Sequence, residues 1–241
     1  MFTKVCNLCL ISLLLVGCAY REGQRYDVNN PIVRKFSWFS YLDGNDIRES
    51  CAAGSADRIR LVYNGQYDAQ LRSYDIFVDK HGGAVMNVRA MNNTGNLVNW
   101  STNNIFGPWT WTQSQVTLTS AEVAEFRALL RQSGYGGPAP QGLKLHSQDF
   151  YWIAAGCEGG VFHYYAWNNR PQSMARQGFA GIKFQDFLLK RDKTGVTFRP
   201  PHVTSPAERA SFRRTGGGRA PTGAFELTVR ENGLGGLLNA F

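Results

Sequence analysis

Residues 150–168 read FYWIAAGCEGGVFHYYAWN, and this stretch decides the fold class of the chain. Two runs of strand-forming residues, Phe150 to Cys157 and Val161 to Asn168, flank Glu158-Gly159-Gly160. Glycines at this point favour a tight turn, so the pattern predicts a β-hairpin. Aromatic side chains fall on both faces of each strand, which indicates either a central position covered on both sides or one face left open as a binding platform. We expect the covered arrangement.

Further strands are predicted upstream of this hairpin. Residues 58–63 show a strand pattern, and Asn64-Gly65 supplies the turn that ends it. Leu71 to Val78 and Ala84 to Met91 form two more strands around a turn that contains glycine. A short strand is also expected over residues 36–42, where large apolar side chains alternate with serines.

Two helices are expected to pack against the sheet. Thr119 begins the clearer helix, because Thr119 and Glu122 form a capping box ahead of an apolar stripe at helical spacing. A second helix is predicted from apolar residues between positions 179 and 189, and the charged run 190–193 ends it. Strands, a helix, the hairpin and a helix in this order indicate an α+β fold with an antiparallel sheet, rather than a repeated βαβ array.

The composition is that of a folded, basic protein. The chain has 241 residues, of which 43% are hydrophobic and 13% aromatic, and this content excludes disorder over most of its length. The net charge of +8 favours anionic partners such as nucleic acid, phospholipid headgroups or an acidic cell-wall polymer. From residue 196 to 241 the chain is rich in Pro, Gly and Arg, which predicts a flexible tail with one edge strand at Phe225 to Val229.

The N-terminal segment indicates export. Val5 to Gly17 is an apolar run that suits a signal peptide and is too short for a membrane span. It leads into Leu15-Val16-Gly17-Cys18, which resembles the lipobox of bacterial lipoproteins. The resemblance implies that residues 1–17 are cleaved and that Cys18 carries the lipid. An ordinary signal peptide with a chance cysteine, or an uncleaved N-terminal anchor, is the alternative.

The same resemblance implies a location. Residue 19 is Ala rather than the Asp that marks retention at the inner membrane in this family. In a Gram-negative host the protein is therefore expected at the outer membrane, facing the periplasm, where nucleic acid is not an expected partner. Residues 18–31 would form a tether and residues 32–195 a single globular domain. The run from Asp57 through the hairpin also resembles uncharacterised proteobacterial lipoproteins, which implies a compartment and no activity.

The roles of the five cysteines follow from the lipobox resemblance. Cys6 and Cys9 leave with the signal peptide and Cys18 is taken by lipid, so Cys51 and Cys157 remain. In an oxidising compartment a lone pair of cysteines most simply forms one disulfide. Two separate buried thiols, or a reactive cysteine with a histidine partner, are the alternatives.

No catalytic signature occurs in the chain. It contains no Gly-x-Ser-x-Gly elbow, phosphate loop, dinucleotide fingerprint or His-Glu-x-x-His, and no cofactor or metal is expected. Two carboxylates in Asp43-Gly44-Asn45-Asp46 are near enough in sequence to touch calcium. The rest of an EF-hand loop is missing, however, so a polar turn is expected there. His163 is expected to be a structural histidine.

Tryptophans give the best candidates for a ligand platform, since stacked rings beside asparagine amides suit a glycan. The candidate binding aromatics are Trp100, Trp109, Trp111, Trp152 and Trp167. Turns plus core aromatics are the alternative, and the one we expect. The sequence thus predicts a lipid-anchored envelope protein that binds a partner protein or an anionic envelope polymer without catalysis. The alternative function is a periplasmic hydrolase acting on cell-wall glycan or peptide.

Overall fold

The computed structural model describes residues 38–67, 69–92, 111–169, 179–202, 205, 207 and 225–235. These residues combine helices with a six-stranded antiparallel sheet, which confirms the mixed fold class and the antiparallel sheet. The large sheet has the order β4 (Thr112–Leu118), β3 (Ala84–Asn92), β2 (Gln70–Val78), β1 (Arg58–Gly65), β6 (Phe150–Glu158) and β7 (Val161–Asn168). A small sheet has the order β5 (Lys144–His146), β8 (Glu226–Arg230) and β9 (Gly233–Gly235).

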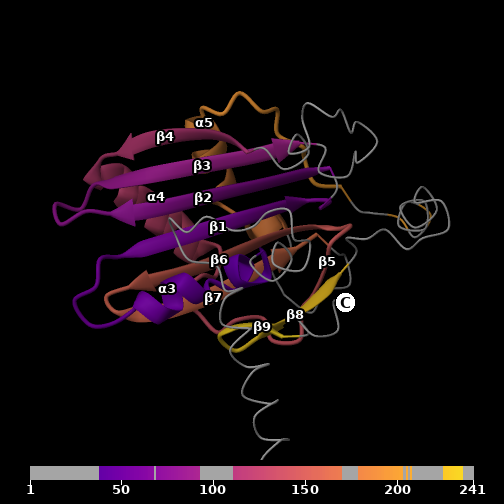
Figure 1. The fold of residues 1–241 in the computed structure, drawn as a ribbon, viewed down its shortest axis with the longest axis horizontal. Helices are drawn as coiled ribbons and strands as arrows, with labels where there is room; N and C mark the ends of the chain where they lie inside the picture. The colour runs from indigo at the N-terminus through magenta and orange to yellow at the C-terminus, as the bar shows by residue number, and fades with distance from the viewer. Residues whose placement is uncertain are drawn as a thin grey trace, which may run out of the picture.

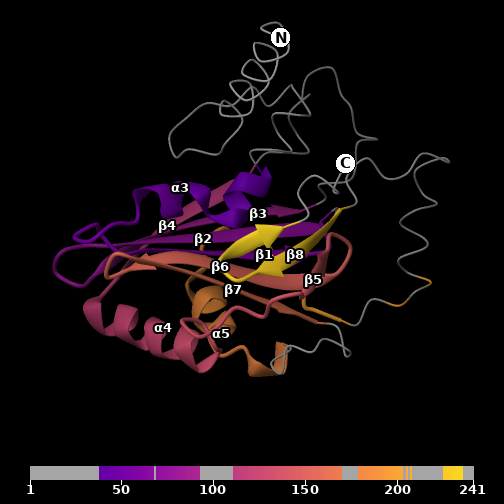
Figure 2. The same ribbon diagram turned by 90° about the horizontal axis from the view of Figure 1, so that it is seen from below.

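The described elements are arranged in layers. Figure 1 looks onto the large sheet, and Figure 2 looks along it. The helices α4 (Ser120–Gln132) and α5 (Gln185–Arg191) cover one face, while α3 (Asn45–Ser50) and the small sheet lie over the other. Each face of the large sheet therefore contributes to its own apolar core. None of the helices among the described residues is long and apolar enough to cross a membrane.

The hairpin forms as predicted, with Tyr151 opposite Asn168 and Glu158 opposite Val161. β6 lies between β1 and β7, and its residues 150–157 are all buried. Trp152 faces the core under α4 and α5, whereas Tyr151 faces the core under α3. The expected covered arrangement is therefore confirmed for β6, and β7 forms an edge of the sheet.

The strand expected over residues 36–42 is wrong in the described part, because residues 38–43 are helical. Phe39 and Leu42, three positions apart, both bury their side chains in the core on this face, which is helical spacing. Asn45 begins α3 where a polar turn was expected, and only Gly44, in the left-handed conformation, separates the two helical segments.

Two element boundaries also differ from the prediction. Asn64-Gly65 lies inside β1 rather than in a turn, because the Asn64 amide donates hydrogen bonds to the carbonyl oxygens of Ser147 and Asp149. The second helix begins only at Gln185, after a short 3-10 turn, and it includes part of the charged run expected to end it.

Part of the predicted tail packs against the core. β8 lies between β5 and β9 and buries Leu227 and Val229, so the expected strand exists but has a partner on both sides. Residues 196–202 pass beside the sheet, and the Tyr63 hydroxyl donates a hydrogen bond of 2.7 Å to the carbonyl oxygen of Arg199. The remaining tail residues, the whole tether and the signal segment lie outside the described residues.

Arginines are buried on both faces of the sheet. Under α3, Arg60 is 1% exposed and makes ion pairs with Asp46 at 2.7 Å and with Asp75 at 3.0 Å. On the helix face, the buried Arg72 pairs with Asp192, which follows α5. These pairs tie elements that are distant in the sequence to the central strands β1 and β2.

Cys51 and Cys157 lie at disulfide-bonding distance, with their Cα atoms 5.6 Å apart. Cys51 ends α3 and Cys157 lies near the end of β6, so the bond would join the helix to the sheet. This geometry fits the disulfide expected from the sequence.

Candidate functional site

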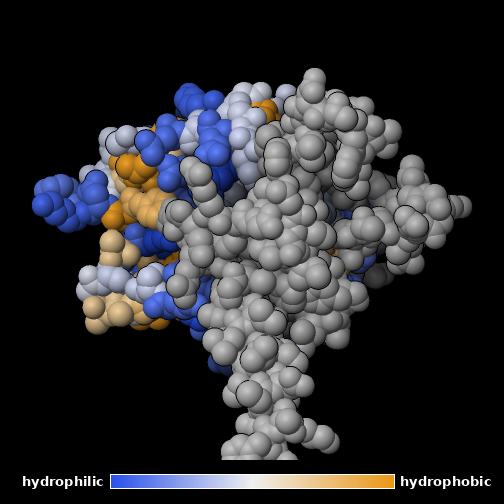
Figure 3. Space-filling view, in the orientation of Figure 1, coloured by the Kyte–Doolittle hydropathy of each residue, from blue (hydrophilic) through white to orange (hydrophobic). Residues whose placement is uncertain are grey.

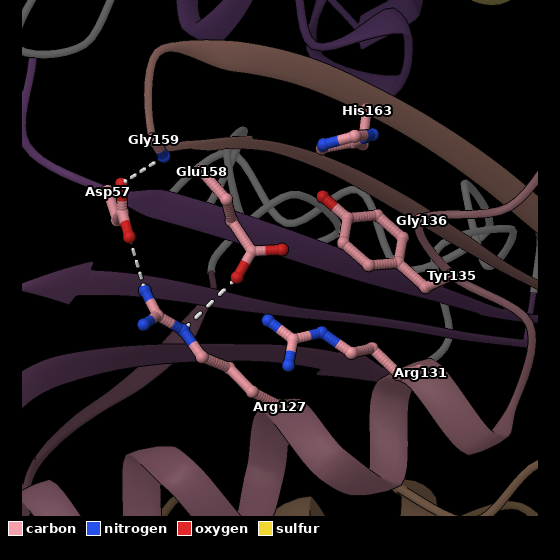
Figure 4. Close-up of a pocket in the computed structure, with 8 residues that line it drawn as sticks. All are labelled: Asp57, Arg127, Arg131, Tyr135, Gly136, Glu158, Gly159 and His163. Carbon is pink, nitrogen blue, oxygen red and sulfur yellow. Dashed lines mark hydrogen bonds and ion pairs between the residues drawn. The ribbon is translucent and has the colours of Figure 1, made fainter.

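A polar cavity of about 580 Å³ opens on the helix side of the hairpin (Figure 4). Residues from α4, the turn after it, the β6–β7 hairpin and the approach to β1 line this cavity. They are Asp57, Arg127, Arg131, Tyr135, Gly136, Glu158, Gly159 and His163.

The helix α4 sets the position of one wall. Its predicted capping box is confirmed: the Thr119 hydroxyl accepts a hydrogen bond from the Glu122 N–H, and the Glu122 carboxylate accepts one from the Thr119 N–H at 2.9 Å. Arg127 and Arg131 are four positions apart, so they lie on one side of the helix. Tyr135 follows after four more residues, in the turn that ends the helix.

Arg127 bridges two carboxylates at the floor of the cavity. Its Nη2 atom donates to Asp57 Oδ2 at 2.5 Å, and its Nε atom lies 3.1 Å from Glu158 Oε1. The other oxygen of Asp57 accepts a hydrogen bond of 2.8 Å from the Gly159 N–H. The hairpin turn, α4 and the start of β1 are thus joined by one ionic group with a net charge of −1.

Tyr135 is buried, at 3% exposed, and its hydroxyl has no hydrogen-bond partner among the described residues. Burial raises the pKa of this hydroxyl well above its usual range, the charges of Glu158 and Asp57 raise it further, and Arg127 opposes them. The hydroxyl is therefore protonated at neutral pH and offers both a donor and an acceptor. Gly156 makes room for it, since a Cβ atom there would lie 2.4 Å from the hydroxyl oxygen.

Two further side chains at the cavity have unused hydrogen-bonding capacity. His163 packs edge-on against Tyr135, with ring centroids 5.9 Å apart, and makes no hydrogen bond to another described residue. Arg131 is exposed, and its guanidinium forms no ion pair or hydrogen bond within the described part of the chain. Figure 4 shows the Tyr135 hydroxyl pointing toward Glu158 and His163, with Arg131 on the α4 side.

Two of the candidate binding aromatics are core residues, which is the alternative that the sequence favours. Trp152 and Trp167 are 0% exposed, because both faces of the hairpin are covered. Their indole N–H groups donate to Gln185 Oε1 at 3.2 Å and to the Ser133 carbonyl oxygen at 2.7 Å. Neither ring can therefore stack on a ligand.

The other sequence-predicted residues lie elsewhere. Trp111 is half-buried and packs against Trp38, with ring centroids 6.3 Å apart, away from the cavity lining. Trp100, Trp109 and the lipid-attachment candidate Cys18 lie outside the described residues.

Asp43 and Asp46, the two carboxylates considered as calcium ligands, bind other groups of the protein. Asp43 accepts hydrogen bonds from Arg48 at 3.1 Å and from the Leu234 N–H at 2.6 Å. Burial, the largest influence, raises the pKa of Asp43 against the opposing effect of Arg48. Asp46 pairs with Arg60. Within the described ranges, no group of three or more His, Cys, Asp or Glu side chains is placed to hold a metal ion.

The surface away from the cavity is mixed in character. Figure 3 shows hydrophilic and hydrophobic residues side by side on the described surface, and the exposed turn from Asp79 to His81 projects as a hydrophilic group. No extended apolar patch among the coloured residues of this view competes with the cavity as a candidate site.

The residues proposed from the sequence do not include four that line the cavity: Arg127, Arg131, Tyr135 and Glu158. The spacing of Arg127 and Arg131 at an interval of four was the available signal, because it places both on one side of the predicted helix, whereas Tyr135 lies in the turn beyond it. No protein-family model matches the chain, and no curated protein or solved structure is detectably similar to it, so the chemistry of the site is the guide to function.

Proposed function

We propose that this chain is a lipid-anchored envelope protein that binds an anionic group of an envelope polymer in the α4–hairpin cavity, without catalysing a reaction. Arg131 carries this proposal: its guanidinium borders the cavity and has no partner among the described residues. A free guanidinium suits a carboxylate or a phosphate, because its planar donors form two parallel hydrogen bonds with such a group.

Tyr135 supports the same proposal. A buried hydroxyl without a partner costs about 1–3 kcal/mol, and a ligand that supplied the missing hydrogen bond would recover this energy on binding. Charge also favours a polyanion. The chain from Cys18 onward keeps a net charge of +7, since residues 1–17 contribute only Lys4 to the total of +8.

The anchoring part of the proposal rests on the lipobox resemblance at Cys18. A single acyl chain binds a membrane weakly, so durable anchoring requires the two or more chains that lipoproteins of this class carry. Placement at the outer membrane, facing the periplasm of a Gram-negative host, follows from Ala19. The Cys51–Cys157 geometry supports an oxidising compartment, because disulfides form and persist there.

The described residues favour this binding role over the hydrolase alternative. Asp57 and Glu158 are the two carboxylates of the cavity. Glycoside hydrolysis needs such a pair to flank the scissile bond, whereas the Arg127 guanidinium contacts both of them. The buried Trp152 and Trp167 also provide no platform for a sugar.

Retention on purified cell-wall sacculi tests the binding proposal. Arg131→Gln removes a charge-assisted interaction worth about 1.5–3 kcal/mol, so we expect at least a tenfold loss of affinity in a cosedimentation assay. Arg230→Gln is the matched control: it removes an exposed arginine from β8, on the opposite side of the large sheet, and should leave affinity unchanged. An equal loss in both variants would reduce the interaction to general charge attraction.

Metabolic labelling with palmitate tests the anchor. We expect the wild-type chain to incorporate label and to fractionate with membranes, and Cys18→Ser to lose both, because its hydroxyl cannot form the thioether that begins lipidation. Cys51→Ser is a suitable control, since Cys51 lies near Cys157 in the folded chain. Label that persists in Cys18→Ser would overturn the proposal.

A further inference from the structure

The charged groups at the cavity balance to zero. Asp57 and Glu158 contribute two negative charges, and Arg127 and Arg131 contribute two positive charges, with His163 counted as neutral. A site for a simple anion gains most from a net positive lining, because uncompensated cations attract the ligand. The lining of this cavity instead carries equal numbers of positive and negative groups.

The two signs are separated in space. Arg127 contacts both carboxylates, so these three side chains form one ionic group with a net charge of −1. Arg131 takes no part in that group and is the single uncompensated cation among the lining residues. In Figure 4, Glu158 reaches toward the cavity from the hairpin, while Arg131 reaches toward it from α4.

Hydrogen-bonding capacity matches this division of charge. Only one oxygen of Glu158 contacts Arg127, and the second makes no ion pair or hydrogen bond to another described residue. The Tyr135 hydroxyl lies close enough for the charge of Glu158 to raise its pKa. The His163 ring adds a further polar group on this side of the cavity. The hairpin side of the cavity therefore offers several acceptors for a cation, and the α4 side offers donors for an anion.

From this arrangement we propose that the cavity binds the head group of an α-amino acid, with its ammonium and its carboxylate free on the same carbon. The carboxylate would take the Arg131 guanidinium, and the ammonium would take the outer oxygen of Glu158 and the Tyr135 hydroxyl. This inference rests on the proposed function and deepens it, since it narrows the anionic group to a zwitterion. Such a head group occurs in free amino acids and on diamino acids of wall peptides.

Matched ligands test the inference by NMR titration of the full chain. Alanine carries both charges, N-acetylalanine lacks the ammonium, and alaninamide lacks the carboxylate. We expect alanine to bind at least tenfold more tightly than either derivative. If N-acetylalanine binds as tightly as alanine and Arg131→Gln abolishes both, the cavity is a simple anion site: the inference fails and the proposed function stands. If none of the three ligands binds, the inference also fails.

Two variants assign the charges to residues. Glu158→Gln should bring the affinity ratio of alanine to N-acetylalanine close to one, while the ratio of alanine to alaninamide stays high. Arg131→Gln should do the reverse, and Arg230→Gln should change neither ratio. Equal changes of both ratios in both variants would overturn the assignment. Unfolding curves recorded in parallel identify a variant that has lost its fold, and for Glu158→Gln the milder Glu158→Asp then takes its place.

A competition experiment distinguishes wall peptide from free amino acids as the source of the head group. If wall peptide is the source, alanine should displace the full chain from sacculi, and amidation of the free diamino-acid carboxyl in the sacculi should weaken retention tenfold. If free amino acids are the source, alanine should bind without displacing the chain, and retention on sacculi should then be independent of Arg131. Either result is compatible with the zwitterion site, and failure of alanine to bind at all is not.

Discussion

Replacing Asp75 with alanine is expected to lower the free energy of unfolding by about 3–5 kcal/mol, the usual result of removing one partner of a buried ion pair. Asp75 Oδ2 lies 3.0 Å from Arg60 and 2.9 Å from Arg58. Without it, the buried Arg60 guanidinium loses its ion pair with Asp75 and keeps the pair with Asp46. Urea denaturation followed by tryptophan fluorescence measures the change, because Trp152 and Trp167 are buried.

The matched control is Glu226→Ala, which removes the exposed pair between Lys144 and Glu226. That pair is expected to contribute less than about 1 kcal/mol. Similar losses in the two variants would show that Asp75 is no more than a surface charge.

The pH dependence of the free energy of unfolding provides a second test of the Asp75 prediction. Burial, the largest single influence, raises the pKa of Asp75, but Arg60 and Arg58 together outweigh it and hold the pKa below its usual value of 3.8. The stabilisation is therefore fully present above pH 3.8 and is lost as the pH falls through the lowered pKa. The difference in stability between wild type and Asp75→Asn should shrink below pH 3.8 and stay constant from pH 5 to 7.

The double variant Cys51→Ala/Cys157→Ala, which cannot form the expected disulfide, should have a free energy of unfolding about 4–5 kcal/mol lower than that of the wild type. The two cysteines are 106 positions apart, and closing so long a loop removes much of the entropy of the unfolded chain. Removing both sulfurs avoids a lone thiol beside Ser55, whose Oγ lies 3.4 Å from the Cys157 sulfur.

Comparison of oxidised wild type, reduced wild type and the double variant measures this effect. The reduced wild type and the double variant should unfold at the same denaturant concentration, well below the oxidised protein. Unfolding of the wild type at one concentration with or without reductant would contradict the prediction.

The parts of the fold that were predicted correctly depend on short-range sequence patterns. The capping box at Thr119 and Glu122 and the glycine turn at 158–160 act within a few residues, so the sequence alone identifies α4 and the β6–β7 hairpin. The errors arose where distant groups decide the structure. Asn64 continues β1 because carbonyl groups more than 80 residues away bind its amide.

The candidate site was harder to predict for the same reason. Arg131 and His163 line one cavity only because α4 packs on the helix face of the sheet, and no spacing in the sequence records that arrangement. The sequence leaves two roles open for the tryptophans, core packing and ligand binding, because exposure depends on what covers a strand. Trp152 and Trp167 have the composition of a ligand platform, yet α4 and α5 bury both.

The packing of β8 and β9 against the sheet also fixes an order of events during synthesis. A chain that has emerged only as far as residue 224 already contains all six strands of the large sheet, but it lacks Leu227 and Val229, which cover one face. Asp43 likewise receives its hydrogen bond from the Leu234 N–H only after another 191 residues have followed it. Val62 and Ile153 therefore lack part of their apolar cover until the last described strands arrive. During synthesis, this interval is when the nascent protein most needs a chaperone.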